Sequence, residues 1–386
     1  MIPYGKHHLD EHDVAEVNAV LASDWLTQGP QVPAFEANLA SKFGATHAVA
    51  VNSATSALHV AMIAVGLGPG DVLWTVPNTF VASANCAVYC GADVDFVDID
   101  VTTFNLDVSA LAQKLASAEI TGTVPKVVVA VHFGGMPCDL HALHALKLKY
   151  GFFLIEDASH AVGALYDGAP VGNCQFSDIT VFSFHPVKII TTGEGGAALT
   201  NDGELAHRME LARSHGITRD DDKMLGKPDG PWTYQQIDIG YNYRMTDIAA
   251  ALGNSQLTRL DDFVSQRVGI ADRYGGALDD GRVVVQHRLP QARSSWHLYV
   301  ICLADGMLVA DRLRFFEFMR ASGVGVAIHY APVHLQPFYR KRGFEPGMFP
   351  NSESYYTRCL SLPIYPTLQQ ADQDFVIEQV HKFLNG

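Results

Sequence analysis

Short apolar runs rich in β-branched residues alternate with segments of helical period along the first 250 residues. The runs are Ala48–Val51, Val72–Val76, Asp93–Val97, Val127–Val131, Phe152–Glu156, Ile179–Ser183 and Gly196–Thr200. Such alternation is typical of βαβ units, and near-continuous apolar strands are expected where helices cover both faces of a sheet. We therefore predict an α/β fold with a mostly parallel central sheet, in a large domain over residues 1–250.

The pattern changes after a helix that is expected to reach about Arg273. Strands are then predicted at Val283–Gln286, His297–Leu303 and Gly325–Tyr330, with a helix near Ala310–Ser322. These elements predict a smaller C-terminal α/β domain over residues 251–386, on which the extreme N-terminus is expected to pack. The segment Thr218–Gln236 is polar and rich in glycine, proline and aspartate, and it is predicted to be a mobile loop.

Composition narrows the classes of partner. The chain has 386 residues, 48% of them hydrophobic and 18% charged, with a formal net charge of −14. The net charge is negative and the chain has no run of lysine and arginine residues. Nucleic acid and membrane surfaces, which are themselves negatively charged, are therefore not expected partners. The N-terminus has no leader pattern and no apolar run approaches about 20 residues, so a cytoplasmic location is expected. Six cysteines and seventeen histidines show no metal-binding spacing, and no metal is predicted.

Two residues with distinctive chemistry follow predicted central strands. Asp157 ends the run in FLIEDASHAVGA, and Lys188 follows the strand in VFSFHPVKIITTGEGG. Ligands bind at the carboxyl ends of strands in open parallel sheets. Pyridoxal 5′-phosphate (PLP) needs a lysine that forms an imine with its aldehyde and a carboxylate that keeps its pyridine nitrogen protonated. The sequence offers both groups in this order.

A third requirement of PLP is a cradle for its phosphate. The segment AVNSATSALHVAM, over Ala50–Met62, places small and hydroxyl residues directly before a predicted helix, whose N-terminal N–H groups favour an anion. Each element also has a purely structural explanation. Asp157 could cap a helix, and small residues before a helix commonly serve as caps. The ordered combination of the three elements is what favours PLP.

The chain resembles the DegT/StrS family of nucleotide-sugar aminotransferases over nearly its whole length. The resemblance rests on WLTQGP (25–30), NSATSAL (52–58), TFVASANC (79–86), EDASHAVGA (156–164), SFHPVKIITTGEGG (183–196) and IGYNYRMTDIAAALG (239–253). It implies fold type I of the PLP enzymes, with pyridoxamine 5′-phosphate as an intermediate. It also implies roles for several residues: Lys188 as the Schiff-base lysine, Asp157 at the pyridine nitrogen, Ser183 with the Ala54 and Thr55 backbone at the phosphate, and Phe80 stacked on the ring.

His160 stands where many members of the family have glutamine, and the resemblance places it near the cofactor ring and its 3′-oxygen. This histidine is shared with the subgroup that acts as 4-aminotransferase in pseudaminic acid biosynthesis. The C-terminal half resembles the same subgroup in VAIHYAPVHLQPFYRKRGF (326–344), FPNSESYY (349–356) and LSLPIYPTL (360–368).

The resemblance further implies a homodimer with shared active sites. Asn242 and Arg244 would come from the other subunit, and the loop carrying Tyr234 would reach across. Turn formation by Asn242 and a surface ion pair of Arg244 remain alternatives. The nucleotide-sugar pocket would be lined by Trp25 and Thr27 of the segment Trp25–Gly29 and by the pair His329–Tyr330. His334 would lie nearby. Alternatively, His329 is a satisfied strand-end histidine and Trp25 packs between domains.

The expected reaction is a ping-pong transfer from L-glutamate to C4 of a UDP-4-keto-6-deoxy-2-acetamido sugar, giving UDP-4-amino-4,6-dideoxy-N-acetyl-β-L-altrosamine. Lys188 would shuttle the proton. Alternatives are an aminotransferase for perosamine or a dTDP-amino sugar, a PLP-dependent sugar dehydratase, and a non-catalytic regulator. The dehydratase keeps a histidine where this chain has Lys188, and no DNA-binding motif or basic face supports the regulator.

Overall fold

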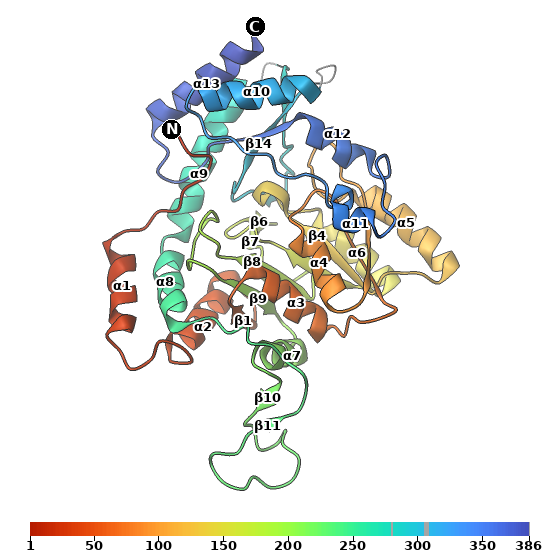
Figure 1. The fold of residues 1–386 in the computed structure, drawn as a ribbon, viewed down its shortest axis with the longest axis vertical. Helices are drawn as coiled ribbons and strands as arrows, with labels where there is room; N and C mark the ends of the chain where they lie inside the picture. The colour runs from red at the N-terminus through yellow and green to blue at the C-terminus, as the bar shows by residue number, and fades with distance from the viewer. Residues whose placement is uncertain (279–280, 305–308, 386) are drawn as a thin grey trace.

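A seven-stranded sheet forms the centre of the computed structural model, which describes residues 1–278, 281–304 and 309–385 (Figure 1). In spatial order the strands are β1 (His47–Val51), β9 (Gly196–Thr200), β8 (Ile179–Ser183), β5 (Phe153–Asp157), β4 (Val127–Val131), β2 (Val72–Thr75) and β3 (Asp93–Phe96). The sheet is mostly parallel as predicted, but β9 runs antiparallel to both of its neighbours. The amino end of β9 therefore lies at the same edge as the carboxyl ends of the other strands.

Alternate residues of the strands enter two separate cores. In β1, Val49 and Val51 join one core, whereas Ala48 and Ala50 join the other. The sheet is therefore buried on both faces, which explains the continuous apolar runs. The helices of this part are α1 (Glu11–Leu21), α2 (Gln31–Phe43), α3 (Ala54–Ala64), α4 (Ala82–Tyr89), α5 (Val108–Thr121), α6 (Leu140–Tyr150), α7 (Gly203–Arg213) and α8 (Asp247–Leu257).

Several helices around the sheet begin at residues whose side chains accept N–H groups of the first turn. Asp107 caps α5 by accepting the N–H groups of Ser109 and Ala110, and Gly122 ends it with a φ of 69°. A short polar side chain at the start and a left-handed glycine at the end are the usual signals for helix boundaries. These signals place the sheet-to-helix turns, and hence the cavity at the sheet edge.

A smaller three-stranded sheet and a third core follow in the sequence. The sheet contains β12 (Val283–Val285), β14 (Tyr299–Leu303) and β15 (Cys359–Leu362), and it packs with α9 (Leu260–Leu278), α10 (Val309–Ala321) and α13 (Gln370–Leu384). Along α9 the buried side chains pass from the second core, ending at Val264, to the third, starting at Ile270. The division into domains at residue 250, which falls within α8, remains our proposal.

The predicted strand at Gly325–Tyr330 is wrong. This segment forms only an isolated bridge from Ala327 to Ser361 of β15, and Ile2 bridges the preceding Val324. The chain then turns so that His329 and Tyr330 line the cavity described below, which prevents a continuous ladder. The third strand is β15, whose four residues were not predicted. The long helix α9 also extends five residues beyond Arg273, to Leu278.

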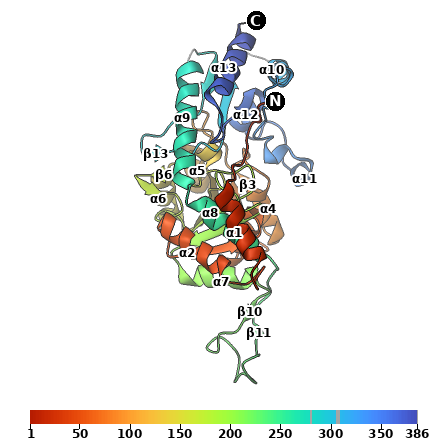
Figure 2. The same ribbon diagram turned by 90° about the vertical axis from the view of Figure 1, so that its left-hand side faces the viewer.

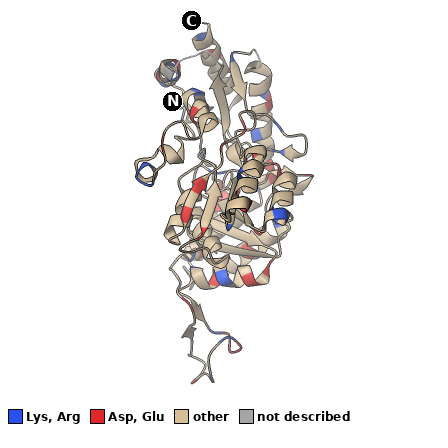
Figure 3. Cartoon of the chain, turned by 90° about the vertical axis from the view of Figure 1, so that its right-hand side faces the viewer, with Lys and Arg blue, Asp and Glu red and all other residues tan. Residues whose placement is uncertain are grey.

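The remaining elements are short. They are α11 (Pro337–Arg340) and α12 (Pro350–Arg358), the small sheet of β6 (Leu165–Tyr166), β7 (Ala169–Pro170) and β13 (Ala292–Arg293), and the hairpin of β10 (Ile217–Thr218) and β11 (Gln235–Gln236). The hairpin closes the predicted loop and extends away from the body of the molecule in both views (Figures 1 and 2). Acidic and basic residues are interspersed in the view of Figure 3. No helix in the described ranges is long and apolar enough to cross a membrane.

Candidate active site

A cavity of about 310 Å³ opens at the carboxyl edge of the central sheet. Asp157 and Ser183 are the last residues of β5 and β8, so the sheet itself brings them to this edge. Among the residues singled out from the sequence, the cavity is lined by Ala54, Thr55, Phe80, Asp157, His160, Ser183, Lys188, His329 and Tyr330. The structure therefore brings together residues that lie up to 276 positions apart in the chain, from Ala54 to Tyr330.

Asp157 is held in a fixed orientation by two donors. Ser83 of α4 donates its hydroxyl to one carboxylate oxygen at 2.6 Å, and the Ser159 N–H donates to the other at 3.1 Å. The Ser83 hydroxyl in turn accepts from Thr79 at 2.8 Å. Only 5% of Asp157 is exposed. Asp157 therefore places a buried and oriented carboxylate where it can meet a cationic group in the cavity.

Lys188 provides the amine of the site. Lys188 lies in the turn after β8, where its main-chain N–H donates to the carbonyl of His185 at 2.9 Å. Burial lowers the pKa of Lys188 from 10.5 to about 8, and the charge of Asp157 opposes this shift. An amine with this pKa is partly unprotonated near neutral pH, as a nucleophile or a general base requires.

The start of α3 forms an anion site beside these groups. Ser53 caps the helix through the N–H of Ser56, which leaves the first N–H groups, those of Ala54 and Thr55, without an intrahelical partner. A Cβ on Gly196 would lie 2.5 Å from the Ala54 nitrogen, so glycine is required for β9 to approach this turn. The helix N-terminus together with Ser183 fits a phosphate group.

A cluster of aromatic and imidazole rings forms another wall of the cavity. His160 bonds to the Tyr330 hydroxyl at 3.1 Å, its second ring nitrogen accepts the Gly134 N–H, and its ring lies 4.5 Å from that of His297. Burial, with Lys188 nearby, lowers the pKa of His160 well below its ordinary value and that of His329 to about 4. Burial also raises the pKa of Tyr330. These groups are therefore uncharged at neutral pH.

The other predicted residues lie away from this cavity. Trp25, Tyr234 and Arg244 line a second cavity of about 610 Å³ at the base of the β10–β11 hairpin. Thr27 and Asn242 form isolated backbone bridges to Thr246 and Ser214, and neither lines either cavity. Within one chain, the predicted site is thus divided into two groups.

Several residues of the main cavity were not found by sequence reasoning. Tyr4, His297 and Glu194 line it, and Ser83 orients Asp157. Ser83 lies within the motif TFVASANC, but nothing in its spacing indicates that it meets Asp157. Tyr4 arrives from the N-terminal segment, which is anchored by hydrogen bonds between Ile2 and Gly323 and between Tyr4 and Ile364.

The arrangement fits PLP. A buried amine, an oriented carboxylate and a helix N-terminus match the aldehyde, the pyridine nitrogen and the phosphate of this cofactor, and the aromatic Phe80 stands at the same cavity. No group of three or more histidine, cysteine, aspartate or glutamate residues suited to a metal ion occurs among the described residues. Fold and site together define a fold type I PLP-dependent enzyme.

Comparison with known proteins identifies the family. Residues 7–381 match the DegT/DnrJ/EryC1/StrS aminotransferase family, and the chain belongs to it. The spore coat polysaccharide biosynthesis protein SpsC of Bacillus subtilis is 39% identical, covering 100% of this chain and 97% of SpsC. A UDP-4-amino-4,6-dideoxy-N-acetyl-beta-L-altrosamine transaminase of Campylobacter jejuni is 36% identical, covering 100% of this chain and 98% of the relative.

Solved structures agree with this assignment. Helicobacter pylori PseC, an aminotransferase involved in the biosynthesis of pseudoaminic acid, matches with a TM-score of 0.91 and 30% identity, covering 100% of this chain and 99% of PseC. Spr1654 from Streptococcus pneumoniae in its PMP form also gives a TM-score of 0.91, at 29% identity, with 100% and 99% covered. The chain is thus a PLP-dependent sugar aminotransferase.

Proposed function

We propose that this protein transfers an amino group from L-glutamate to C4 of a UDP-linked 4-keto-6-deoxy-2-acetamido sugar, with UDP-4-amino-4,6-dideoxy-N-acetyl-β-L-altrosamine as the product. The observation that carries the proposal is His160, hydrogen-bonded to Tyr330 in the wall of the cavity. By the family resemblance, this histidine in place of glutamine is shared with the subgroup that makes this sugar. Full-length similarity to two Campylobacter transaminases of that name supports the same substrate.

PLP, when bound, supplies an electrophilic aldehyde and a ring that takes up the electron pair of the bond broken at the substrate carbon. Asp157 would keep the pyridine nitrogen protonated, because a buried carboxylate favours a nearby cation. Ala54, Thr55 and Ser183 would hold the phosphate. Lys188 Nζ would accept a proton from the amino-bearing carbon of glutamate and later return one to C4 of the sugar. Its lowered pKa supports both directions of transfer.

We further propose that the second cavity serves the partner subunit of a homodimer. Its three predicted residues, Trp25, Tyr234 and Arg244, lie together but apart from Lys188. The hairpin beside it carries apolar side chains exposed to solvent, with Leu225 85% and Trp232 72% exposed. Side chains of this kind at an extended hairpin favour burial against another surface. Arg244 would then meet the carboxylate of glutamate or the diphosphate of the sugar, for which the main cavity has no arginine among its lining residues.

A panel of substrates tests the proposal in two stages. L-glutamate added to the PLP-loaded protein should abolish the visible absorption band and release 2-oxoglutarate. Each keto sugar is then added to the separated protein, and return of the band is recorded together with the mass of the product. The UDP-4-keto-6-deoxy-2-acetamido sugar should restore the band at the lowest concentration. If only a GDP- or dTDP-linked keto sugar restores it, the proposed substrate is wrong although the enzyme class stands.

One observation favours a second candidate. The identity to SpsC, 39%, exceeds the 36% identity to the Campylobacter transaminases. A different nucleotide-linked keto sugar, destined for a surface polysaccharide, is therefore the alternative substrate. The substrate panel separates the candidates, because the second one predicts that a keto sugar other than the UDP-4-keto-6-deoxy-2-acetamido sugar restores the band at the lowest concentration.

A further inference from the structure

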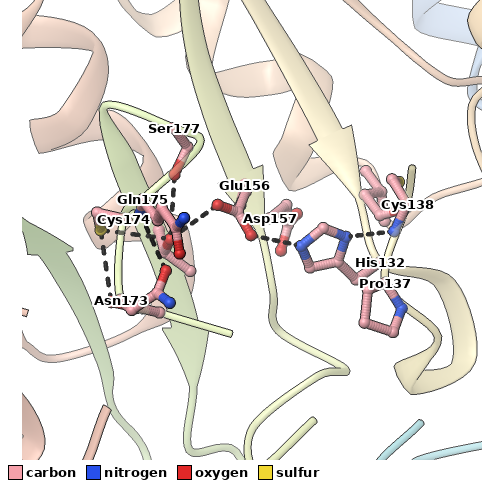
Figure 4. Close-up of polar contacts among 12 residues, drawn as sticks. His132, Pro137, Cys138, Glu156, Asp157, Asn173, Cys174, Gln175 and Ser177 are labelled. Carbon is pink, nitrogen blue, oxygen red and sulfur yellow. Dashed lines mark hydrogen bonds and ion pairs between the residues drawn. The ribbon is translucent and has the colours of Figure 1, made fainter. Parts of the chain in front are cut away.

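A buried hydrogen-bonded pair lies directly behind the carboxylate of the site. His132 follows β4, and its Nε2 lies 2.7 Å from an oxygen of Glu156, the residue before Asp157 (Figure 4). The side chains are 0% and 3% exposed. The other ring nitrogen, Nδ1, accepts the N–H of Cys138 at 3.1 Å. That bond needs a lone pair on Nδ1, so the ring carries one proton, on Nε2, and directs it at Glu156. Burial opposes a charged ring, whereas the contacts with Cys138 and Glu156 raise the pKa of His132; a second proton, on Nδ1, would displace the Cys138 N–H.

His132 also contacts the backbone of Asp157. Its own N–H donates to the Asp157 carbonyl at 3.1 Å. One residue therefore fixes two successive positions at the end of β5: Glu156 through the side chain and Asp157 through the main chain. The two acidic side chains point to opposite faces of the sheet because they are neighbours in a strand. Asp157 faces the cavity, and Glu156 lies in the layer behind it.

The charge of Glu156 has no formal counter-ion in the described part of the chain. Its partners there are His132, which carries no charge while Nδ1 accepts the Cys138 N–H, and, at 3.4 Å, the hydroxyl of Thr180. Burying a carboxylate without a cation costs several kcal/mol, and an apolar residue would pack in a central strand at lower cost. Costly buried polar groups concentrate at functional sites, which calls for a role beyond folding.

We infer that His132 and Glu156 are positioning residues that fix Asp157 and add a second buried negative charge behind it, strengthening proton binding at the cofactor's pyridine nitrogen and at Lys188. A buried anion stabilises any cation nearby through the low-dielectric interior. The Glu156 charge thus acts with Asp157 on the same protons, although it does not face the cavity. The inference depends on Asp157 facing the pyridine nitrogen and is independent of which sugar is the substrate.

The decisive measurement is a pH titration of the visible absorption band of the PLP-loaded protein. Glu156→Gln keeps the shape and an oxygen that accepts from His132 but removes the charge. The midpoint of the band's pH titration should fall by about one pH unit, which is the scale expected when a buried charge next to Asp157 in the strand is removed. Asp178→Asn is the matched control, because Asp178 also bonds to β5, accepting the Leu154 N–H at 2.8 Å, but at the end of the strand remote from the cavity. It should leave the midpoint unchanged.

Two substitutions of His132 test its bond to Glu156 separately from its bond with Cys138. They also provide an alternative test if Glu156→Gln does not fold. His132→Gln places a donor near the former Nε2 and preserves the bond to Glu156. His132→Asn places an acceptor near the former Nδ1 and preserves only the bond from Cys138. The asparagine variant should hold PLP about tenfold more weakly, as is usual when an outer partner of a site is lost. The glutamine variant should remain near the wild type in equilibrium dialysis.

The outcomes are distinguishable. An unchanged midpoint in Glu156→Gln with bound PLP overturns the inference, as does an equal shift in Asp178→Asn, which would indicate general loosening of β5. Asp157→Asn separates this result from the proposed role of Asp157. If that variant also leaves the titration unchanged, the assignment of the pyridine partner fails first. If it alone changes the titration, only the role of the His132–Glu156 pair fails.

Discussion

The main cavity gathers basic side chains whose pKa values are lowered by burial. Lys188, His160, His297 and His329 all line it, and Asp157 is the acidic residue directed at them from β5. Burial lowers the pKa of each histidine, and the proximity of Lys188 adds to the effect. The three histidine rings are therefore neutral near pH 7 and can donate or accept hydrogen bonds, whereas Lys188 and the start of α3 supply the attraction for a negatively charged ligand.

These histidines should make the fold sensitive to acid. A histidine whose pKa is lower in the folded than in the unfolded protein binds fewer protons when folded, so stability is lost as the pH falls below the unfolded value. For His329 the window runs from 6.5 to about 4, and the loss reaches about 1–3 kcal/mol. The melting temperature of the PLP-loaded protein should drop between pH 7 and pH 5.

Replacing one of the buried histidines should reduce this drop. His160→Gln removes a titrating ring and introduces the residue that the resemblance gives for many relatives, so its melting temperature should depend less on pH than that of the wild type. The exposed His7→Gln is the control and should behave as the wild type does. Equal slopes for His160→Gln and the wild type would show that acid acts elsewhere.

At the scale of elements, the phosphate site depends on how closely β9 approaches the start of α3. A methyl group on Gly196 would meet backbone atoms of Ser53 and Ala54 at 2.5–2.7 Å, and backbone cannot rotate away as a side chain can. Gly196→Ala should therefore shift the first turn of α3, weaken PLP binding at least about tenfold and cost about 1–3 kcal/mol of stability. Fluorescence titration with PLP and thermal unfolding measure the two effects.

A neighbouring glycine provides the control for this change. Gly203, the first residue of α7, leaves 3.6 Å between an added Cβ and His47, which is ordinary contact. Gly203→Ala should keep PLP affinity and leave stability unchanged or slightly higher, since alanine favours helix. If both variants bind PLP as the wild type does, the close approach of β9 is not what holds the phosphate site.

Local patterns predicted most elements because most strands of the central sheet are apolar on both faces and many of the helices have their own end signals. The strand predicted at Gly325–Tyr330 was wrong because an apolar, β-branched run is compatible with a strand, but whether it pairs as one depends on residues distant in the sequence. Asp157 and Lys188 were predictable since their chemistry is unusual at strand ends. Ser83 and His132 were not, because their contacts with Asp157 and Glu156 depend on residues that are distant in the sequence.

At the scale of the whole molecule, the separation of Arg244 from Lys188 predicts that two inactive variants repair each other. Lys188→Ala and Arg244→Ala should each be nearly inactive alone. In a mixed dimer, one of the two sites would receive both residues intact, so random mixing of equal amounts should restore about a quarter of the wild-type activity. Co-expression with two different tags and sequential purification isolates the mixed dimers, which should show about half of the wild-type activity because one of their two sites is intact.

The same mixture also tests whether the site is shared at all. Activity no greater than the sum of the separate variants, in a preparation shown by native mass spectrometry to contain mixed dimers, would place Arg244 outside the partner's site. A monomeric wild type at assay concentrations would reject the dimer directly.

The attachment of the N-terminus sets an order of events during biosynthesis. Ile2 and Tyr4 are held by backbone bonds to Gly323, Gly325 and Ile364, and Tyr4 forms part of the cavity wall. During translation the partners of these residues emerge more than 300 residues after them. The active-site wall therefore cannot close during translation of the large sheet, and a nascent chain that has already folded around Asp157 and Lys188 still lacks it.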